Sequence, residues 1–215
     1  DEDDDALGAG QTSHPWLTKL ATSSLRSGPD GSCVATTLGN MDRLGIPSFS
    51  GGTTADPNNS RGAMVQMVKA GKWTSLNLSG SNLRTIKSAY GTISAYVINA
   101  DSYERMAKNG QIPSGAIIFQ TRHGWSVNSG ASGNDMGIVR DRGRHTFNYK
   151  LMSPIIYSNA KEVVILVPKK IEVDTVGVWT CTSSFVHPPH ITTLPACALF
   201  TEVVIILVAA RVKYI

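Results

Sequence analysis

The sequence has few charged residues and no long hydrophobic run. Asp, Glu, Lys and Arg make up only 17% of its 215 residues, whereas about a quarter is typical of globular proteins. The late apolar run extends only from Val203 to Ala210, between charged neighbours, which is far short of the ~20 residues that span a bilayer. We therefore expect no transmembrane segment. The ordinary hydrophobic content of 41% and the 20 glycines instead predict a polar, loop-rich α+β domain.

A basic stripe with interleaved aromatic residues, the usual mark of nucleic-acid binding, is also missing. The net charge is +4, but the first five residues are all acidic, so the remainder of the chain carries +9. A basic body favours contact with anionic polymers, such as those of the bacterial envelope. We therefore predict no nucleic-acid partner.

The chain begins with an acidic run, where a signal peptide would have a basic segment and then an apolar one. Residues 1–13 are acidic and then small and polar, a composition typical of a disordered leader. We expect any export to use another route, such as a secretion apparatus or a phage particle.

Cysteine is scarce, and its odd number excludes complete pairing. Of Cys33, Cys181 and Cys197, at least one must be a free thiol, and we assign that state to Cys33. The two late cysteines either pair with each other or are small buried hydrophobes, the interpretation we favour. Together with His187 and His190 they match no compact zinc pattern, so we predict no metal site.

Periodicity divides the chain into three parts: a leader at 1–13, a domain at 14–168 and a C-terminal extension of unknown role at 169–215. Helical spacing comes first in the domain, and alternating or continuous apolar runs follow. The predicted helices are 33–44, 63–70 and 102–109, and the predicted strands are 92–98, 116–121, 136–140, 146–150 and 163–167. The fold class is therefore α+β, with N-terminal helices packed on an antiparallel sheet.

Cys33 lies at the predicted start of a helix, directly after the turn-forming run 27–32 (Ser-Gly-Pro-Asp-Gly-Ser). A thiol with a reference pKa of ~8.5 is mostly protonated near neutrality. The unpaired N–H groups and the dipole at a helix N-terminus favour the thiolate, and a neighbouring histidine favours it further. One histidine, His123, stands just beyond the strand 116–121. Cys33 is therefore our candidate nucleophile.

These segments resemble the NlpC/P60 and CHAP families of cell-wall cysteine peptidases and amidases. Gly31-Ser32-Cys33-Val34 resembles the nucleophile segment, and 113–119 (Pro-Ser-Gly-Ala-Ile-Ile-Phe) resembles the family's Pro-x-Gly-Asp-hydrophobic strand. Residues 134–139 (Asn-Asp-Met-Gly-Ile-Val) resemble the strand that follows. The resemblance spans residues 28–150 and implies a papain-like domain that hydrolyses amide bonds of peptidoglycan.

One position departs from the family pattern, which places its histidine directly before the second strand, where this sequence has Asn134 and Asp135. If the two strands form a hairpin, His123 comes to lie opposite the start of the second strand, close to Asp135. A carboxylate fixes the tautomer of an imidazole and favours the imidazolium. We therefore assign Cys33 as nucleophile, His123 as base and Asp135 as orienting residue, with His145 as the competing base.

The predicted function is that of a peptidoglycan-degrading cysteine endopeptidase or amidase, carried by a phage particle or delivered by a secretion system. It would act in the bacterial periplasm or cell wall, or as part of a virion, through a thioester intermediate and without a metal or cofactor. Its partners would be a peptidoglycan or peptide substrate and the delivering particle or apparatus. The alternatives are a structural or interaction protein of a virion with an inactive papain-like domain, and a cysteine protease that acts on proteins.

Overall fold

The computed structural model describes residues 14–49, 59–121, 127, 134–152, 161–169, 174–175 and 210–211. The chain divides into two units, residues 1–169 and 170–215. The described residues of the second unit form a short antiparallel pair of β9 (Asp174–Thr175) and β10 (Ala210–Arg211). The predicted leader lies outside the described residues, as does most of the predicted extension. None of the described helices is long and apolar enough to cross a membrane.

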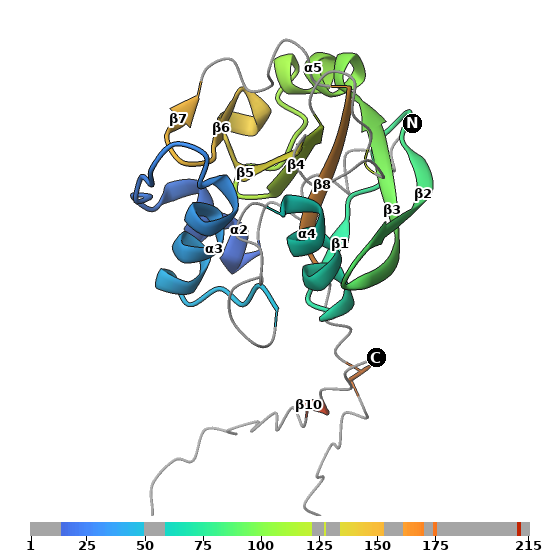
Figure 1. Cartoon of the computed structure of the whole chain (residues 1–215), viewed down its shortest axis with the longest axis horizontal. Helices are drawn as coiled ribbons and strands as arrows, with labels where there is room; N and C mark the ends of the chain where they lie inside the picture. The colour runs from blue at the N-terminus through green and yellow to red at the C-terminus, as the bar shows by residue number, and fades with distance from the viewer. Residues whose placement is uncertain are drawn as a thin grey trace, which may run out of the picture. The chain divides into compact units, whose positions relative to one another are not determined.

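An eight-stranded sheet forms the centre of the first unit (Figure 1). Its order is β2-β3-β8-β4-β5-β6-β7, and all its described pairings are antiparallel. Strand β1 pairs with the last residues of β8, whose first residues pair with β3. The strands are β1 (Trp73–Ser75), β2 (Asn82–Ser88), β3 (Gly91–Asn99), β4 (Ile117–Thr121), β5 (Asn134–Arg140), β6 (His145–Phe147), β7 (Leu151–Met152) and β8 (Glu162–Pro168).

Strands β4 and β8 form the buried middle of this sheet. All five residues of β4 are buried, and so is β8 from Val163 onward. Such continuous apolar runs are typical of strands that are covered on both faces, and the β-branched residues that dominate them suit a pleated surface. Alternate residues of β8 belong to two different hydrophobic clusters, Val164 to one and Val163 to the other. The sheet therefore has a core on each face.

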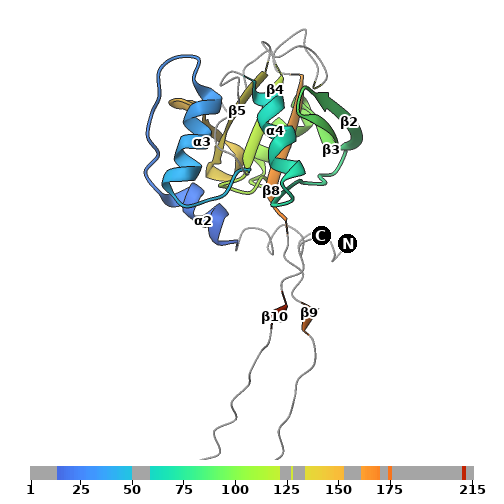
Figure 2. The same cartoon turned by 60° about the horizontal axis from the view of Figure 1, so that its bottom comes forward.

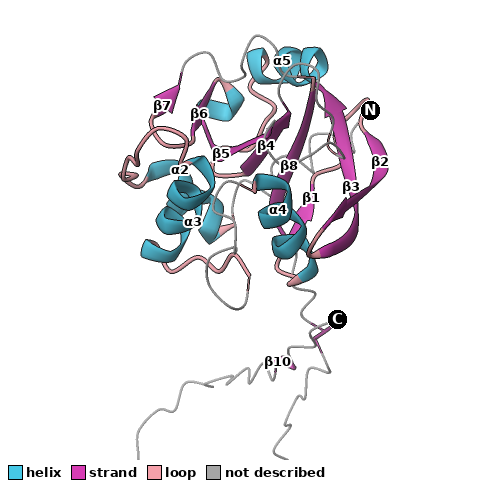
Figure 3. Cartoon of the chain, viewed as in Figure 1, coloured by secondary structure: helices cyan, strands magenta, loops and turns pink. Residues whose placement is uncertain are grey.

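Helices cover both faces of the sheet (Figure 3). Helices α3 and α4 contribute buried residues to the cluster that contains Val164, and they lie on the same side of the sheet (Figure 2). Helix α5 contributes Tyr103 and Ala107 to the cluster on the other face, and α2 contributes one leucine to each cluster. The helices are α2 (Pro15–Thr22), α3 (Cys33–Arg43), α4 (Ser60–Lys69) and α5 (Ala100–Lys108), with a 3-10 turn, η2 (Asp141–Gly143), between β5 and β6.

The predicted α+β class, with helices packed on an antiparallel sheet, is confirmed. Each of the three predicted helices and five predicted strands overlaps an observed one. The sequence analysis missed α2, β1 and β2. Strand β2 buries only Ile86, because it lies at the edge of the sheet and its remaining side chains are exposed or half-buried. An apolar alternation therefore does not mark it.

The buried side chain of Asn40 holds the segment before α3 against that helix. Its Oδ1 accepts a hydrogen bond from Arg26 N–H (2.8 Å), and its Nδ2 donates to the carbonyl oxygens of Arg26 (3.0 Å) and Thr36 (2.9 Å). Asn40 is only 3% exposed, so these groups have little access to water in exchange. The asparagine thereby fixes the path of the chain toward Cys33.

We expect Asn40→Ala to lower the free energy of unfolding by about 1–3 kcal/mol, because it leaves buried polar groups of Arg26 without their partner. Urea titration of the full chain measures this loss. The matched control is Asn82→Ala on the exposed end of β2, which should change stability by less than about 0.5 kcal/mol. Equal effects of the two substitutions would contradict the role assigned to Asn40.

Candidate active site

Cys33 is the first residue of α3, and the turn before it is tightly packed. Gly28 N–H donates to Tyr149 O (3.0 Å), and a Cβ on Gly28 would lie 2.0 Å from Thr36 Oγ1, so only glycine fits there. The Ser32 hydroxyl donates to Pro29 O (2.6 Å) and not to the helix, whose first turn has no side-chain cap. The N–H groups of that turn are therefore left to serve the thiol.

The Cys33 thiol meets an open edge of β5. Val139 N–H donates to Ala116 O on the β4 side, so by alternation Met136 N–H faces away from β4. On that far side β6 pairs only with residues 138–140 of β5. The Met136 N–H is thus free of a strand partner there and donates to Cys33 Sγ.

Burial raises the pKa of the Cys33 thiol, which is only 5% exposed. The N–H groups of Met136 and Val34 donate to the sulfur and act in the opposite direction, but the net pKa is still raised. Both the charge of Asp135 and its hydrogen bond with the thiol add to the increase. Within the described residues, the site therefore holds a neutral thiol, and a thiolate there requires a cation beside it.

Asp135 is brought to Cys33 as the second residue of β5. It is 4% exposed, and it pairs across the hairpin with Gln120 of β4. The structure thus brings two of the three predicted site residues together, although they are about a hundred positions apart in the sequence. His123, the third, lies outside the described residues, as do Trp125 and the two late cysteines.

His145 does not lie near Cys33. It pairs with Arg140 at the far end of β5, five residues or about 17 Å along the strand from Asp135. Its Nδ1 contacts Asp141 Oδ2 (3.5 Å) in the turn that joins β5 to β6. The alternative that His145 serves as the base is therefore wrong, because strand length separates it from the thiol.

The described residues contain no cluster of three His, Cys, Asp or Glu side chains that could hold a metal ion. The sequence analysis missed Glu162, which lies at the start of β8 and binds both β4 and residue 127. An isolated glutamate before an apolar strand carries no signal of such a role. Only the sheet order reveals it, because β8 lies beside β4 although some forty residues separate them in the sequence.

The chain matches no protein-family model, no curated protein and no solved structure. The functional argument therefore depends on the residues and the geometry of this site.

We expect Asp135→Asn, placed in a chain that carries His123→Ala, to lower the pKa of Cys33. The substitution removes the carboxylate charge, which disfavours the thiolate, and no imidazole complicates the effect. The pH dependence of iodoacetamide alkylation of Cys33 measures it, and the profile should shift to lower pH.

Asp141→Asn is the matched control, because Asp141 is half exposed and pairs with His145 away from the thiol. Its alkylation profile should coincide with that of the parent chain. A profile for Asp135→Asn that stays in place or moves to higher pH would contradict the contact between Cys33 and Asp135.

Proposed function

We propose that the chain is a cysteine hydrolase that cleaves peptide or amide bonds of peptidoglycan. Cys33 is the nucleophile, His123 the general base and Asp135 the residue that orients the imidazole. The observation that carries the proposal is the juxtaposition of the Cys33 sulfur, the uncapped N-terminus of α3 and a buried carboxylate at the start of β5. A nucleophile, a source of N–H donors and an orienting acid are the parts that a thiol hydrolase needs besides its base.

Chain connectivity supports His123 as that base. Thr121 ends β4 and pairs with Asn134, the neighbour of Asp135. His123 follows Thr121 by two residues, so its Cα lies within about 7 Å of the Thr121 Cα. An imidazole is long enough to reach the end of the hairpin where Asp135 lies. Of the five histidines in the chain, this is the one that covalent geometry ties to the thiol's end of the sheet.

The raised pKa of Cys33 defines what His123 has to do. As the reaction begins, the imidazole takes the proton of the thiol, and the resulting imidazolium lies between two anions, the thiolate and Asp135. This ion pair offsets the desolvation that otherwise holds the thiol neutral. The N–H groups of Met136 and Val34 already face the sulfur and stabilise the thiolate further.

The reaction then follows the usual course for a thiol hydrolase. The thiolate attacks the amide carbonyl carbon, and free N–H groups in the first turn of α3 stabilise the oxyanion. The carbon–nitrogen bond breaks as the imidazolium gives its proton to the leaving amine, which leaves a thioester on Cys33. Water, deprotonated by His123, attacks the thioester, and the thiol is released together with the carboxylic acid product.

Peptidoglycan is the proposed substrate because the body of the chain is basic, with a net charge of +9 beyond its first five residues. Such a body is attracted to an anionic wall. The resemblance to wall-directed peptidases and amidases, quoted above for residues 28–150, supports the same substrate class. Delivery by a phage particle or a secretion system belongs to the same proposal.

A competing candidate function is that of a structural or interaction protein with an inactive papain-like domain. The burial and the raised pKa of Cys33 favour it, because a neutral, enclosed thiol is not a nucleophile. A cysteine protease that acts on proteins shares the proposed chemistry and differs only in substrate. Casein offered in parallel with peptidoglycan separates those two.

We expect Cys33→Ser to abolish hydrolysis of purified peptidoglycan by the full chain, and His123→Ala to reduce it by about 10²–10⁴-fold, the usual contribution of a general base. Release of soluble muropeptides measures the rate. His145→Ala is the matched control and should retain most of the activity, since His145 lies at the far end of β5. Loss of activity in His145→Ala with activity retained in His123→Ala would overturn the assignment of the base.

Alkylation separates an active site from an inactive domain without any substrate. In the active domain, Cys33 should react with iodoacetamide near about pH 6.5 faster than Cys181 and Cys197, because only its thiol is paired with an imidazolium. Mass spectrometry of the labelled peptides measures the three rates. A Cys33 that stays unlabelled while the two late cysteines react would favour the inactive, structural role.

A further inference from the structure

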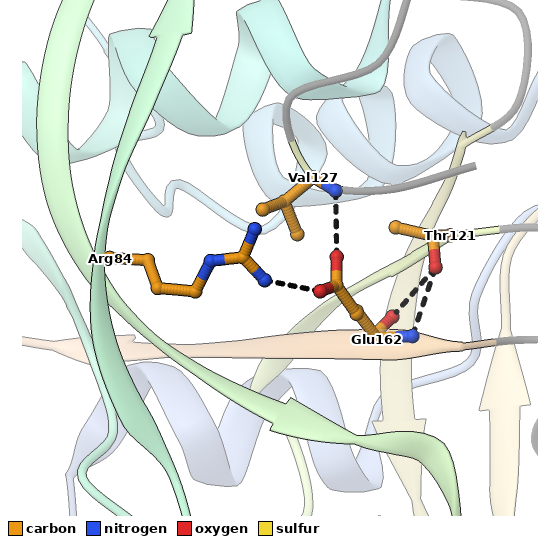
Figure 4. A network of polar contacts seen from close by, with 4 residues as sticks. All are labelled: Arg84, Thr121, Val127 and Glu162. Atoms are coloured by element: carbon orange, nitrogen blue, oxygen red, sulfur yellow. Dashed lines mark hydrogen bonds and ion pairs between the residues drawn. The ribbon is translucent and has the colours of Figure 1, made fainter.

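Glu162 binds three separate parts of the first unit (Figure 4). Its carboxylate forms an ion pair with Arg84 of β2 through Oε1 and accepts a hydrogen bond from Val127 N–H through Oε2 (2.8 Å). Its backbone N–H donates to Thr121 Oγ1 (2.9 Å), at the end of β4. One residue at the start of β8 thus joins an edge strand, a central strand and the connection between β4 and β5.

Two of these contacts hold the ends of one short segment. Thr121 and Val127 flank residues 122–126, among which is His123. Six extended residues could separate these ends by about 20 Å, yet both ends are hydrogen-bonded to Glu162. The distance that the segment has to bridge is therefore set by Glu162.

The two anchors are buried. Thr121 and Val127 are both 0% exposed, and Val127 belongs to the same hydrophobic cluster as Cys33. Arg84 occupies the other carboxylate oxygen, which leaves Oε2 directed at Val127 N–H. A glutamine in this place would present an NH₂ group to one of the two donors, so it would keep the shape of the side chain and lose one of its bonds.

We propose that Glu162 is a positioning residue for the base: by fixing both ends of the segment 122–126, it sets where His123 stands relative to Cys33. This inference deepens the proposed function and rests on it, since it takes His123 as the base. Glu162 itself does not touch the substrate. It acts through His123, so its removal should matter only as long as the imidazole is present.

The experiment compares alkylation of Cys33 in full chains that carry Cys181→Ser and Cys197→Ser, so that one thiol remains. The variants are Glu162→Gln, His123→Ala and the two combined. We expect Glu162→Gln to slow alkylation near about pH 6.5 by roughly 10- to 100-fold, the cost of a small misplacement of a catalytic group. Its pH profile should approach that of His123→Ala. The combined variant should be no slower than His123→Ala alone.

Glu104→Gln is the matched control, because it removes the same charge from an exposed ion pair with Lys108 on α5. It should alkylate like the parent. Hydrogen exchange of the Val127 amide gives a second readout, which Glu162→Gln should accelerate and Glu104→Gln should not. If Glu162→Gln fails to unfold cooperatively, Thr121→Val takes its place, since it removes the other anchor with a side chain of the same shape.

The outcomes separate this inference from the proposed function. Slowing by His123→Ala but not by Glu162→Gln would overturn the positioning role and leave the base assignment standing. An additive loss in the combined variant would overturn it too, because Glu162 would then act independently of His123. Alkylation of His123→Ala at the parent rate would overturn the base assignment and the positioning role together.

Discussion

The insertion of β8 into the middle of the sheet is the constraint on which the rest of the structure depends. This strand is the last of the sheet in sequence, yet it pairs with β4 on one side and with β3 and β1 on the other. Its apolar residues face both hydrophobic clusters, so the two cores form together when it docks. The same docking brings Glu162 to the end of β4, where the segment toward His123 begins.

The site combines two opposing electrostatic demands. A buried thiol beside a carboxylate is most stable in its neutral form, and this is the state that the described residues favour at Cys33. Catalysis needs the thiolate, and the N–H groups that face the sulfur supply only part of its stabilisation. The proposed imidazole reconciles the two, because one cation between two anions lowers the energy of the charged arrangement. In this view the neutral thiol is the resting state.

The departure at the start of β5 acquires a structural meaning. The resembled families place a histidine there, whereas this chain has Asp135, whose carboxylate contacts the Cys33 thiol. Were the base on β5, the strand itself would position it. With the base on the connection between β4 and β5, positioning passes to whatever holds that connection, and Glu162 is the described residue that binds both of its ends.

Local pattern in the sequence determined the class of the fold and the candidate nucleophile. Helical spacing after a dense run of turn formers marked the helix that begins at Cys33, and continuous β-branched runs marked the central strands. The strand order, the contact between Cys33 and Asp135, and the role of Glu162 could not be predicted in this way. Pairing and burial decide them between residues far apart in the chain, and only the tertiary structure brings those residues together.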